Sequence, residues 1–209
     1  MIATAEFEGL DGAAEFFAKI PGVTNKAARM AINQVANRDG LKLARDSIMD
    51  EIAFPKDYLN ASRIGVTQLA TDGNLQAVIT GRKRATSLAR FAAPGTPIGS
   101  SLRSGVRVRV STQGGGQVLR RAWLVRLNKG KSLTEDNYNV GLAVRLGSGD
   151  KVSGKFSPHQ SWLVPGSVAL LYAPSVDQVF RTVADDISPQ VADMTAAEFI
   201  RQFTRLAAA

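Results

Sequence analysis

Apolar residues recur with helical spacing near the start of the chain. Within residues 24–53 two apolar stripes follow the 3.6-residue period, and the polar sequence NRDG at 37–40 separates them. This pattern predicts one long helix that bends at NRDG. A shorter apolar repeat at 11–20 predicts a preceding helix, which we expect to end at the Pro-Gly pair 21–22.

The helical period returns near the end of the chain. Ser175 with Gln178, and Thr195 with Glu198, have the three-residue spacing of a capping box. Apolar residues follow each pair with helical spacing. The sequence therefore predicts two C-terminal helices within 175–206.

Between the helical regions, apolar and polar residues alternate with the period of two that is typical of strands. Residues 64–69 and 74–80 flank the turn-forming sequence TDGN and predict a hairpin. The sequence VRVRV at 106–110 predicts a strand with valines on one face and arginines on the other. A glycine-rich turn leads to a predicted return strand over 119–127, and residues 140–147 predict another strand.

These elements predict an α+β fold with N-terminal helices, a central, mostly antiparallel β-sheet and C-terminal helices. We expect one domain over 1–209: helices in 11–53, a β-rich part in 62–147, a loop in 148–170 and helices in 175–206. The residues in the apolar phase of these elements, which we expect to be buried, are Ile32, Val35, Val106, Val108, Trp123, Val125, Val179, Phe180 and Val183.

Charge is distributed unevenly. The chain has 26 Lys and Arg against 18 Asp and Glu, a net charge of +8. Residues 73–173 hold 15 of the basic and 3 of the acidic residues, whereas the flanking segments 1–72 and 174–209 each have a net charge of −2. The middle segment therefore favours a negatively charged partner.

Catalytic and metal chemistry find little support in the sequence. There is no cysteine and a single histidine, His159, so neither a thiolate site nor a histidine ligand set can form. His159 lies near Ser157, Ser161 and Asp150, which suggests a hydrolase triad, but no nucleophile-elbow motif surrounds these serines. We predict no enzyme activity, no cofactor and no metal site, and from the lack of a long apolar run we predict no membrane contact.

The basic residues of the middle segment leave three interpretations open. They can form a solvated face that discourages pairing between strand edges, contact an acidic subunit, or contact nucleic acid. The residues of this basic set are Arg82, Lys83, Arg84, Arg90, Arg103, Arg107, Arg109, Arg120, Arg121 and Arg126. The candidates that we expect to face an interface or phosphates are Arg103, Arg107, Arg109, Arg120, Arg121 and Arg126.

An ordered series of motifs resembles the prophage minor tail protein Z family, the tail completion proteins of long-tailed bacteriophages. The motifs are SLARF at 87–91, GVRVRV at 105–110, VLRRAWLVRLNKG at 118–130 after a glycine-rich turn, an arginine-bearing strand at 142–146 and LYAPSV at 171–176. Ala173 stands where the family has glycine, and the stretch SGDKVSGKFSPHQSW is an insertion. The loop before GVRVRV also looks like a step of another phage head–tail joining family.

The resemblance implies a structural virion protein at the head-proximal end of the tail. Such a protein is assembled in the host cytoplasm, is needed for head–tail joining and DNA passage, and has no catalytic activity. The implied partners are the tail terminator or tail tube, the neck or connector, further copies of the chain in a ring, and, without sequence specificity, DNA in the channel. The alternative is a basic, sequence-independent nucleic-acid-binding protein.

Overall fold

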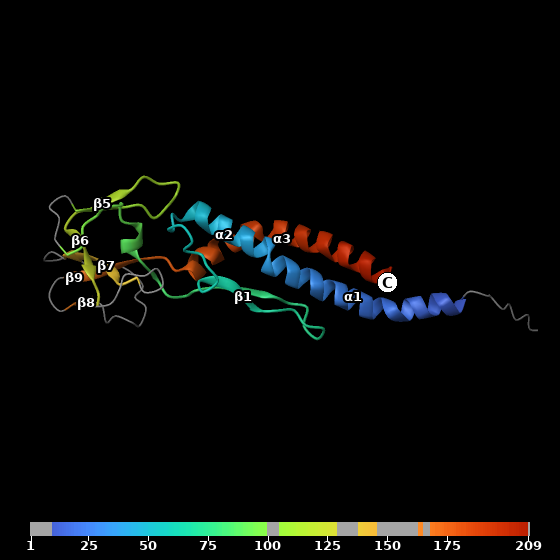
Figure 1. Cartoon of the computed structure of the whole chain (residues 1–209). Helices are drawn as coiled ribbons and strands as arrows, with labels where there is room; N and C mark the ends of the chain where they lie inside the picture. The colour runs from blue at the N-terminus through green and yellow to red at the C-terminus, as the bar shows by residue number, and fades with distance from the viewer. Residues whose placement is uncertain (1–9, 100–104, 129–137, 146–162, 165–167, 209) are drawn as a thin grey trace, which may run out of the picture. The chain divides into compact units, whose positions relative to one another are not determined.

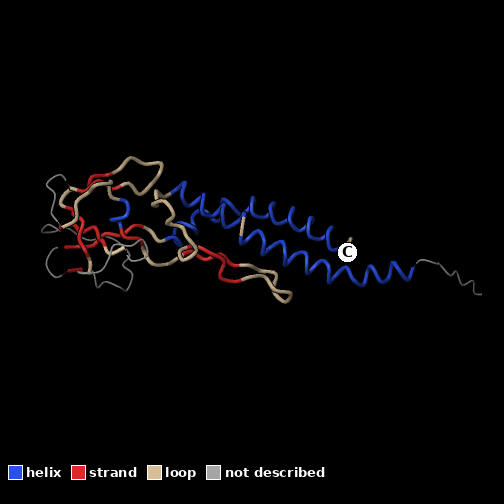
Figure 2. The backbone as a smooth tube through the Cα atoms, in the orientation of Figure 1, coloured by secondary structure: helices blue, strands red, loops and turns tan. Residues whose placement is uncertain are grey.

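The computed structural model describes residues 10–99, 105–128, 138–145, 163–164 and 168–208. It confirms the α+β class, with N-terminal helices, antiparallel strands in the middle and a C-terminal helix (Figures 1 and 2). The elements are α1 (Leu10–Asn37), α2 (Asp39–Glu51), β1 (Ile64–Gln68), β2 (Val78–Gly81), β3 (Thr86–Ser87), the 3₁₀ helix η1 (Leu88–Phe91), β4 (Val106–Val108), β5 (Gln117–Leu119), β6 (Ala122–Arg126), β7 (Val140–Arg145), β8 (Leu163–Val164), β9 (Val168–Ala173) and α3 (Val176–Ala207).

The chain forms two compact units. The first contains residues 1–44, 65–80 and 184–209, and the second contains residues 45–64 and 81–183. Most of the basic middle segment therefore lies in the second unit.

In the first unit, α1 continues through Pro21, so the predicted helix end at this proline is wrong. A proline removes one backbone hydrogen bond, but its φ near −65° is itself helical, so flanking helix can continue across it. The pattern predicts one long helix that bends at NRDG; the break in the pattern is at the predicted place, but the structure has two helices there, because α1 ends at Asn37 and α2 begins at Asp39. The Arg38 amide nevertheless donates to the Gln34 carbonyl at 3.1 Å, which keeps helical bonding across the interruption.

The buried face of α1 consists of Ala27, Ala31 and Val35, which are at most 3% exposed. Their four-residue spacing places them on one side of the helix. Ile32, predicted to be buried, is only partly buried. The buried face is therefore displaced from the predicted stripe, since small alanine side chains rather than the larger isoleucine occupy the close contact.

The C-terminal region is one helix, α3, and not two. The capping box at its start is confirmed: the Gln178 amide donates to the Ser175 hydroxyl at 3.1 Å, and the Ser175 amide donates to the Gln178 side chain at 2.9 Å. The second predicted cap is wrong, because the Thr195 hydroxyl donates to the Val191 carbonyl at 2.8 Å inside the continuous helix. Pro189 lies within this helix, as Pro21 lies within α1.

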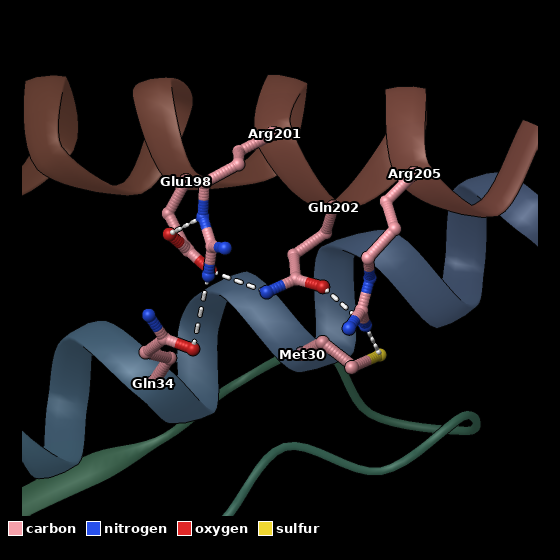
Figure 3. Close-up of polar contacts among 6 residues, drawn as sticks. All are labelled: Met30, Gln34, Glu198, Arg201, Gln202 and Arg205. Carbon is pink, nitrogen blue, oxygen red and sulfur yellow. Dashed lines mark hydrogen bonds and ion pairs between the residues drawn. The ribbon is translucent and has the colours of Figure 1, made fainter. Parts of the chain in front are cut away.

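A row of polar contacts joins α1 to α3 within the first unit, where the two helices lie side by side (Figures 1 and 3). Arg201 donates to both carboxylate oxygens of Glu198, at 2.8 and 2.6 Å, and reaches the Gln34 side chain at 3.5 Å. Gln202 is only 3% exposed and donates to Glu198. Gln202 therefore finds its partner within α3, and the contacts that cross to α1 are those of Arg201 with Gln34 and of Arg205 with the Met30 sulfur, at 3.9 Å.

The hairpin of β1 and β2, predicted from the TDGN turn, is confirmed. Asn33 of α1 holds it in the first unit by a two-way hydrogen bond with the Ala70 backbone, at 2.9 and 2.7 Å. Arg29 and Asp72 form an ion pair at 2.9 Å beside this contact.

The second unit contains a five-stranded antiparallel sheet in the order β3-β9-β7-β6, with β8 also paired to β9. Its central strand β7 is buried on both faces from Val140 to Ala143, which explains its nearly continuous apolar sequence. Because β8 and part of β9 fall within 148–170, the prediction of a loop over that range is wrong for these strands. The core cluster consists of Ala89, Val106, Val108, Ala122, Leu124, Val140 and Leu142.

The predicted arginine hairpin is only partly correct. β4 pairs with β5, with Arg107 opposite Val118, but β6 pairs with β7 instead of continuing β5. A two-residue turn at Arg120 and Arg121 separates β5 from β6, and Arg121 has a left-handed φ of 64°.

This turn resets the alternation. Ala122 and Leu124 are the inward residues of β6, whereas Trp123 and Val125 are only partly buried, contrary to the prediction. Phe180 is also partly buried. The predicted core residues that the structure confirms are Val35, Val106, Val108, Val179 and Val183.

Candidate arginine-rich site

Exposed arginines follow the buried valines of β4. Val106 and Val108 are 1% and 6% exposed, whereas Arg107 and Arg109 are exposed, as the alternation predicts. The remaining described candidates, Arg120, Arg121 and Arg126, are exposed as well. Arg103 lies outside the described residues. We call the five described candidates the exposed arginine face.

The structure brings only part of this face to one place. Arg107 and Arg109 line a wide hollow of about 670 Å³ together with Arg90 and the glycines at 114–116. The Arg109 guanidinium donates to the Thr112 carbonyl at 2.6 Å, so its own hairpin orients it. The other three members of the face are not part of the lining of this hollow.

One wall of the hollow is the loop between β4 and β5, and hydrogen bonds to the end of α2 hold this loop in place. The Thr112 hydroxyl donates to the Asp50 carbonyl, and the Thr112 amide donates to the Glu51 carbonyl at 3.1 Å. The Ala53 amide donates to the Val110 carbonyl at 2.7 Å. These contacts hold the segment from Val110 to Thr112, next to the glycine tip, against the end of α2.

A second arginine cluster surrounds a smaller pocket of about 180 Å³ in the same unit. Its four arginines are Arg63, Arg82, Arg84 and Arg90. The sequence singled out three of them only as members of a basic stretch, and it gave no reason to include Arg63. We call these four residues the arginine pocket.

One buried tyrosine organises the arginine pocket. Tyr58 is 2% exposed, and the guanidinium carbons of Arg63 and Arg90 lie 3.9 and 4.9 Å from its ring centroid. Arg82 donates to the Tyr58 hydroxyl at 3.0 Å. Arginine over an aromatic face is attracted by the ring quadrupole, so the ring of Tyr58 positions Arg63 and Arg90, while its hydroxyl positions Arg82.

The tyrosine is itself held in place. Its ring stacks on Phe54, with centroids 4.8 Å apart and an interplanar angle of 12°. Its hydroxyl shares a buried hydrogen bond with Thr86 at 3.0 Å. Arg90 also lies 4.0 Å from the ring centroid of Tyr138, whose hydroxyl donates to the Ala89 carbonyl at 3.1 Å. Contacts within the chain therefore position Arg63, Arg82 and Arg90.

The electrostatics of the pocket are those of crowded cations. Burial lowers the pKa of Arg82, and its neighbours Arg63, Arg84 and Arg90 lower it further, while Tyr58 opposes the change. Burial raises the pKa of Tyr172, which also lines the pocket, and Arg84 opposes this shift. Burial is the main cause of both shifts, and the positive charge of the neighbouring arginines adds to the shift of Arg82 but opposes that of Tyr172.

The described residues give no support to the hydrolase and metal-site hypotheses. His159, Ser157, Ser161 and Asp150 all lie outside the described residues. In the part of the chain that the structure describes, no group of three or more His, Cys, Asp or Glu side chains could hold a metal ion. None of the described helices is both long and apolar enough to span a membrane.

Comparisons of the chain with protein-family models, with curated proteins and with solved structures find no match. Assignment of a function therefore depends on the residues and their arrangement.

Proposed function

We propose that the chain is a structural virion protein of a long-tailed bacteriophage: a tail completion or minor tail protein at the head-proximal end of the tail. In this role it joins head and tail and allows DNA passage, without catalysis. The motif order over 85–180 supports the proposal by resemblance. The structural observation that carries it is the exposed arginine face on a buried valine-rich core.

A junction protein of this kind assembles as a closed ring, and closed rings need two different patches on each subunit. Arg107 and Arg109, which line one hollow, supply a basic patch. Asp185, Asp186 and Asp193 of α3 are exposed and supply an acidic one. The proposed partners are further copies of the chain, the tail terminator or tail tube, and the neck or connector.

The test is made in the phage or lysogen that carries the gene. Deletion of the gene should leave free heads and tails that electron microscopy can count, and a plasmid copy should restore joining. The informative variant is Arg107→Ala with Arg109→Ala, because both side chains are exposed and line one hollow. Removing a buried interfacial charge costs about 2–5 kcal/mol, so joined particles should fall by roughly tenfold or more.

The matched control is Arg38→Ala with Lys42→Ala, which removes two exposed charges outside the hairpin. It should leave joining unchanged. If the gene deletion yields normal numbers of joined, infectious particles, the proposed role is wrong. If only the hairpin variant does so, the exposed arginine face is a solvated surface and the contact lies elsewhere.

The alternative function is sequence-independent nucleic-acid binding. It is favoured by the hollow beside the glycine tip, whose lining includes three arginines and no acidic residue among those described. Binding of this kind weakens steeply with salt, by about 10³–10⁵ between 50 and 200 mM when 6–10 phosphates are contacted. Fluorescence anisotropy of a random-sequence duplex would reveal this slope.

A further inference from the structure

We propose that the hollow beside the glycine tip binds the acidic side of α3 from a second copy of the chain. The basic residues of this contact are Arg107 and Arg109, and the acidic ones are Asp186 and Asp193. The inference rests on the proposed function, which requires a closed ring, and it names the contact that joins one copy to the next. Its test measures association of the purified protein, so its outcome is separate from that of the joining experiment in the phage.

The hairpin of β4 and β5 presents two accessible arginines. Arg107 and Arg109 are exposed, and within the described residues neither forms an ion pair with a carboxylate. A Cβ atom at Gly116 would lie 3.3 Å from the Arg107 Cγ, so the glycine leaves room for the arginine stem. Arg109 donates to the Thr112 carbonyl, but a guanidinium has five N–H donors, so others remain for a partner. Arg90 also lines the hollow, but its guanidinium already lies over two tyrosine rings, so the contact depends on the two exposed arginines.

The partner surface is a row of three residues on α3. Asp186, Asp193 and Ile200 are seven residues apart, so they lie within about 40° of one another on one side of the helix. All three are exposed, Ile200 by 63%. Neither aspartate forms an ion pair within the described residues. We call these three residues the acidic row, which combines two carboxylates without a described counter-charge and one exposed aliphatic side chain.

The two surfaces have compatible spacings. Seven residues of α-helix rise by about 10.5 Å, whereas two residues of a strand span about 6.7 Å. Because an arginine has a long, flexible stem, each guanidinium needs to lean outward by only about 2 Å for both pairs to form. One helical turn with its side chains is about 10–12 Å wide and fills roughly 420–610 Å³. The hollow of about 670 Å³ therefore has room for one turn of α3.

The rest of the surface favours a protein partner over nucleic acid. Val118 is 47% exposed and lies directly opposite Arg107 on β5. An aliphatic side chain gains from contact with apolar surface, which Ile200 of the acidic row offers and a charged phosphate backbone does not. The one aromatic residue among the described lining residues is Phe91, which is 5% exposed, so bases find no stacking platform in the hollow. Two arginine–carboxylate pairs beside an aliphatic contact therefore make up the interface that we infer.

The test is sedimentation equilibrium of the purified full chain at low ionic strength, where charge pairs are least screened. The hollow variant is Arg107→Glu with Arg109→Glu, and the row variant is Asp186→Arg with Asp193→Arg. Each reversal places like charges against each other, so association of each variant alone should weaken by about tenfold or more. A one-to-one mixture of the two variants should associate within about threefold of the wild type, because each variant then meets the opposite charge on the other.

Two controls reproduce the net charges of these variants. Each reversal changes the net charge by two, so Arg38→Glu with Lys42→Glu lowers it from +8 to +4, as the hollow variant does. Asp39→Arg with Asp46→Arg raises it to +12, as the row variant does, and these two positions have the same seven-residue spacing on α2. All four control positions are exposed. Both controls should associate within about twofold of the wild type, and circular dichroism checks that every variant is folded.

Restored association in the mixture would support the contact between copies. A wild type that stays monomeric, a mixture that stays dissociated, or controls that weaken association as much as the variants do would each overturn it. Unchanged association of the row variant, together with an oligonucleotide that only the hollow variant fails to bind, would assign the hollow to phosphate groups instead. A monomeric wild type combined with a loss of joining on gene deletion would overturn this contact and leave the proposed function standing.

Discussion

Replacing Gly105 with alanine should destabilise the second unit strongly. Gly105 directly precedes β4 and has a left-handed φ of 74°. A Cβ atom there would lie 2.4 Å from the Leu119 carbonyl oxygen and 3.0 Å from the Arg120 Cα. Both neighbours are backbone atoms of β5 and the following turn, so neither can rotate away.

The expected cost has two parts. A left-handed conformation costs a non-glycine residue about 1–2 kcal/mol. Relieving the overlap requires β5 to move away from β4, and overpacking of this kind costs about 1–3 kcal/mol more. We therefore expect Gly105→Ala to lower the free energy of unfolding by about 2–5 kcal/mol, the sum of the two parts.

Two other glycines separate these contributions. Gly95 has a φ of 78°, and no atom lies within 4 Å of the position that a Cβ would take, so Gly95→Ala carries the backbone strain alone. Gly115 has open space around it and no left-handed φ, so Gly115→Ala should change stability by less than about 0.5 kcal/mol. Urea unfolding of the three variants, with unchanged m-values, measures each step.

The decisive comparison is between Gly105→Ala and Gly95→Ala. If their free energies of unfolding agree within about 0.5 kcal/mol, the close approach of β5 to Gly105 is wrong. If Gly95→Ala is as mild as Gly115→Ala, the assumed cost of the left-handed conformation is wrong instead.

The remaining predictions concern the core and the helix pair. Leu124→Ala should lower the free energy of unfolding by about 2–5 kcal/mol, because Leu124 is 5% exposed. Val125→Ala, on the partly buried face of β6, should lower it by about 1 kcal/mol or less. Equal losses in urea unfolding would contradict the observed phase of the strand. Hydrogen bonds from Arg201 hold the pKa of Glu198 below its ordinary value of 4.5; partial burial opposes this shift, and a hydrogen bond from Gln202 adds a smaller contribution that lowers the pKa. Because the folded pKa is the lower one, this stabilisation is present above pH 4.5 and is lost as the pH falls through the folded pKa. The stability difference between the wild type and Glu198→Gln should therefore shrink in unfolding experiments run from pH 6 down to pH 3, and a constant difference would refute the linkage.

The sequence by itself determined the elements whose characteristic residues lie within a few positions of one another. The capping box at Ser175 and Gln178 fixes the start of α3 through contacts three residues apart. The alternation of β4 fixes which of its side chains face outward, because successive residues of a strand point to opposite faces. The α+β class follows from the order of these patterns.

Tertiary structure decided the outcome at the positions where long-range contacts compete with local rules. Pro21 and Pro189 lie inside helices although each is a local helix breaker. The left-handed residue Arg121 ends one strand pairing and begins another, so the alternation on either side of it cannot be joined into a single strand. No periodic signal marks such a change of partner.

The arginine pocket shows the same division most clearly. The sequence determined that the middle segment is basic, since charge is a sum over residues and needs no geometry. It could not show that Arg63 and Arg90 share the ring of Tyr58, or that Arg82 donates to its hydroxyl. These residues are separated along the chain, and only the packing of η1 and the strands of the second unit brings their side chains around one pocket.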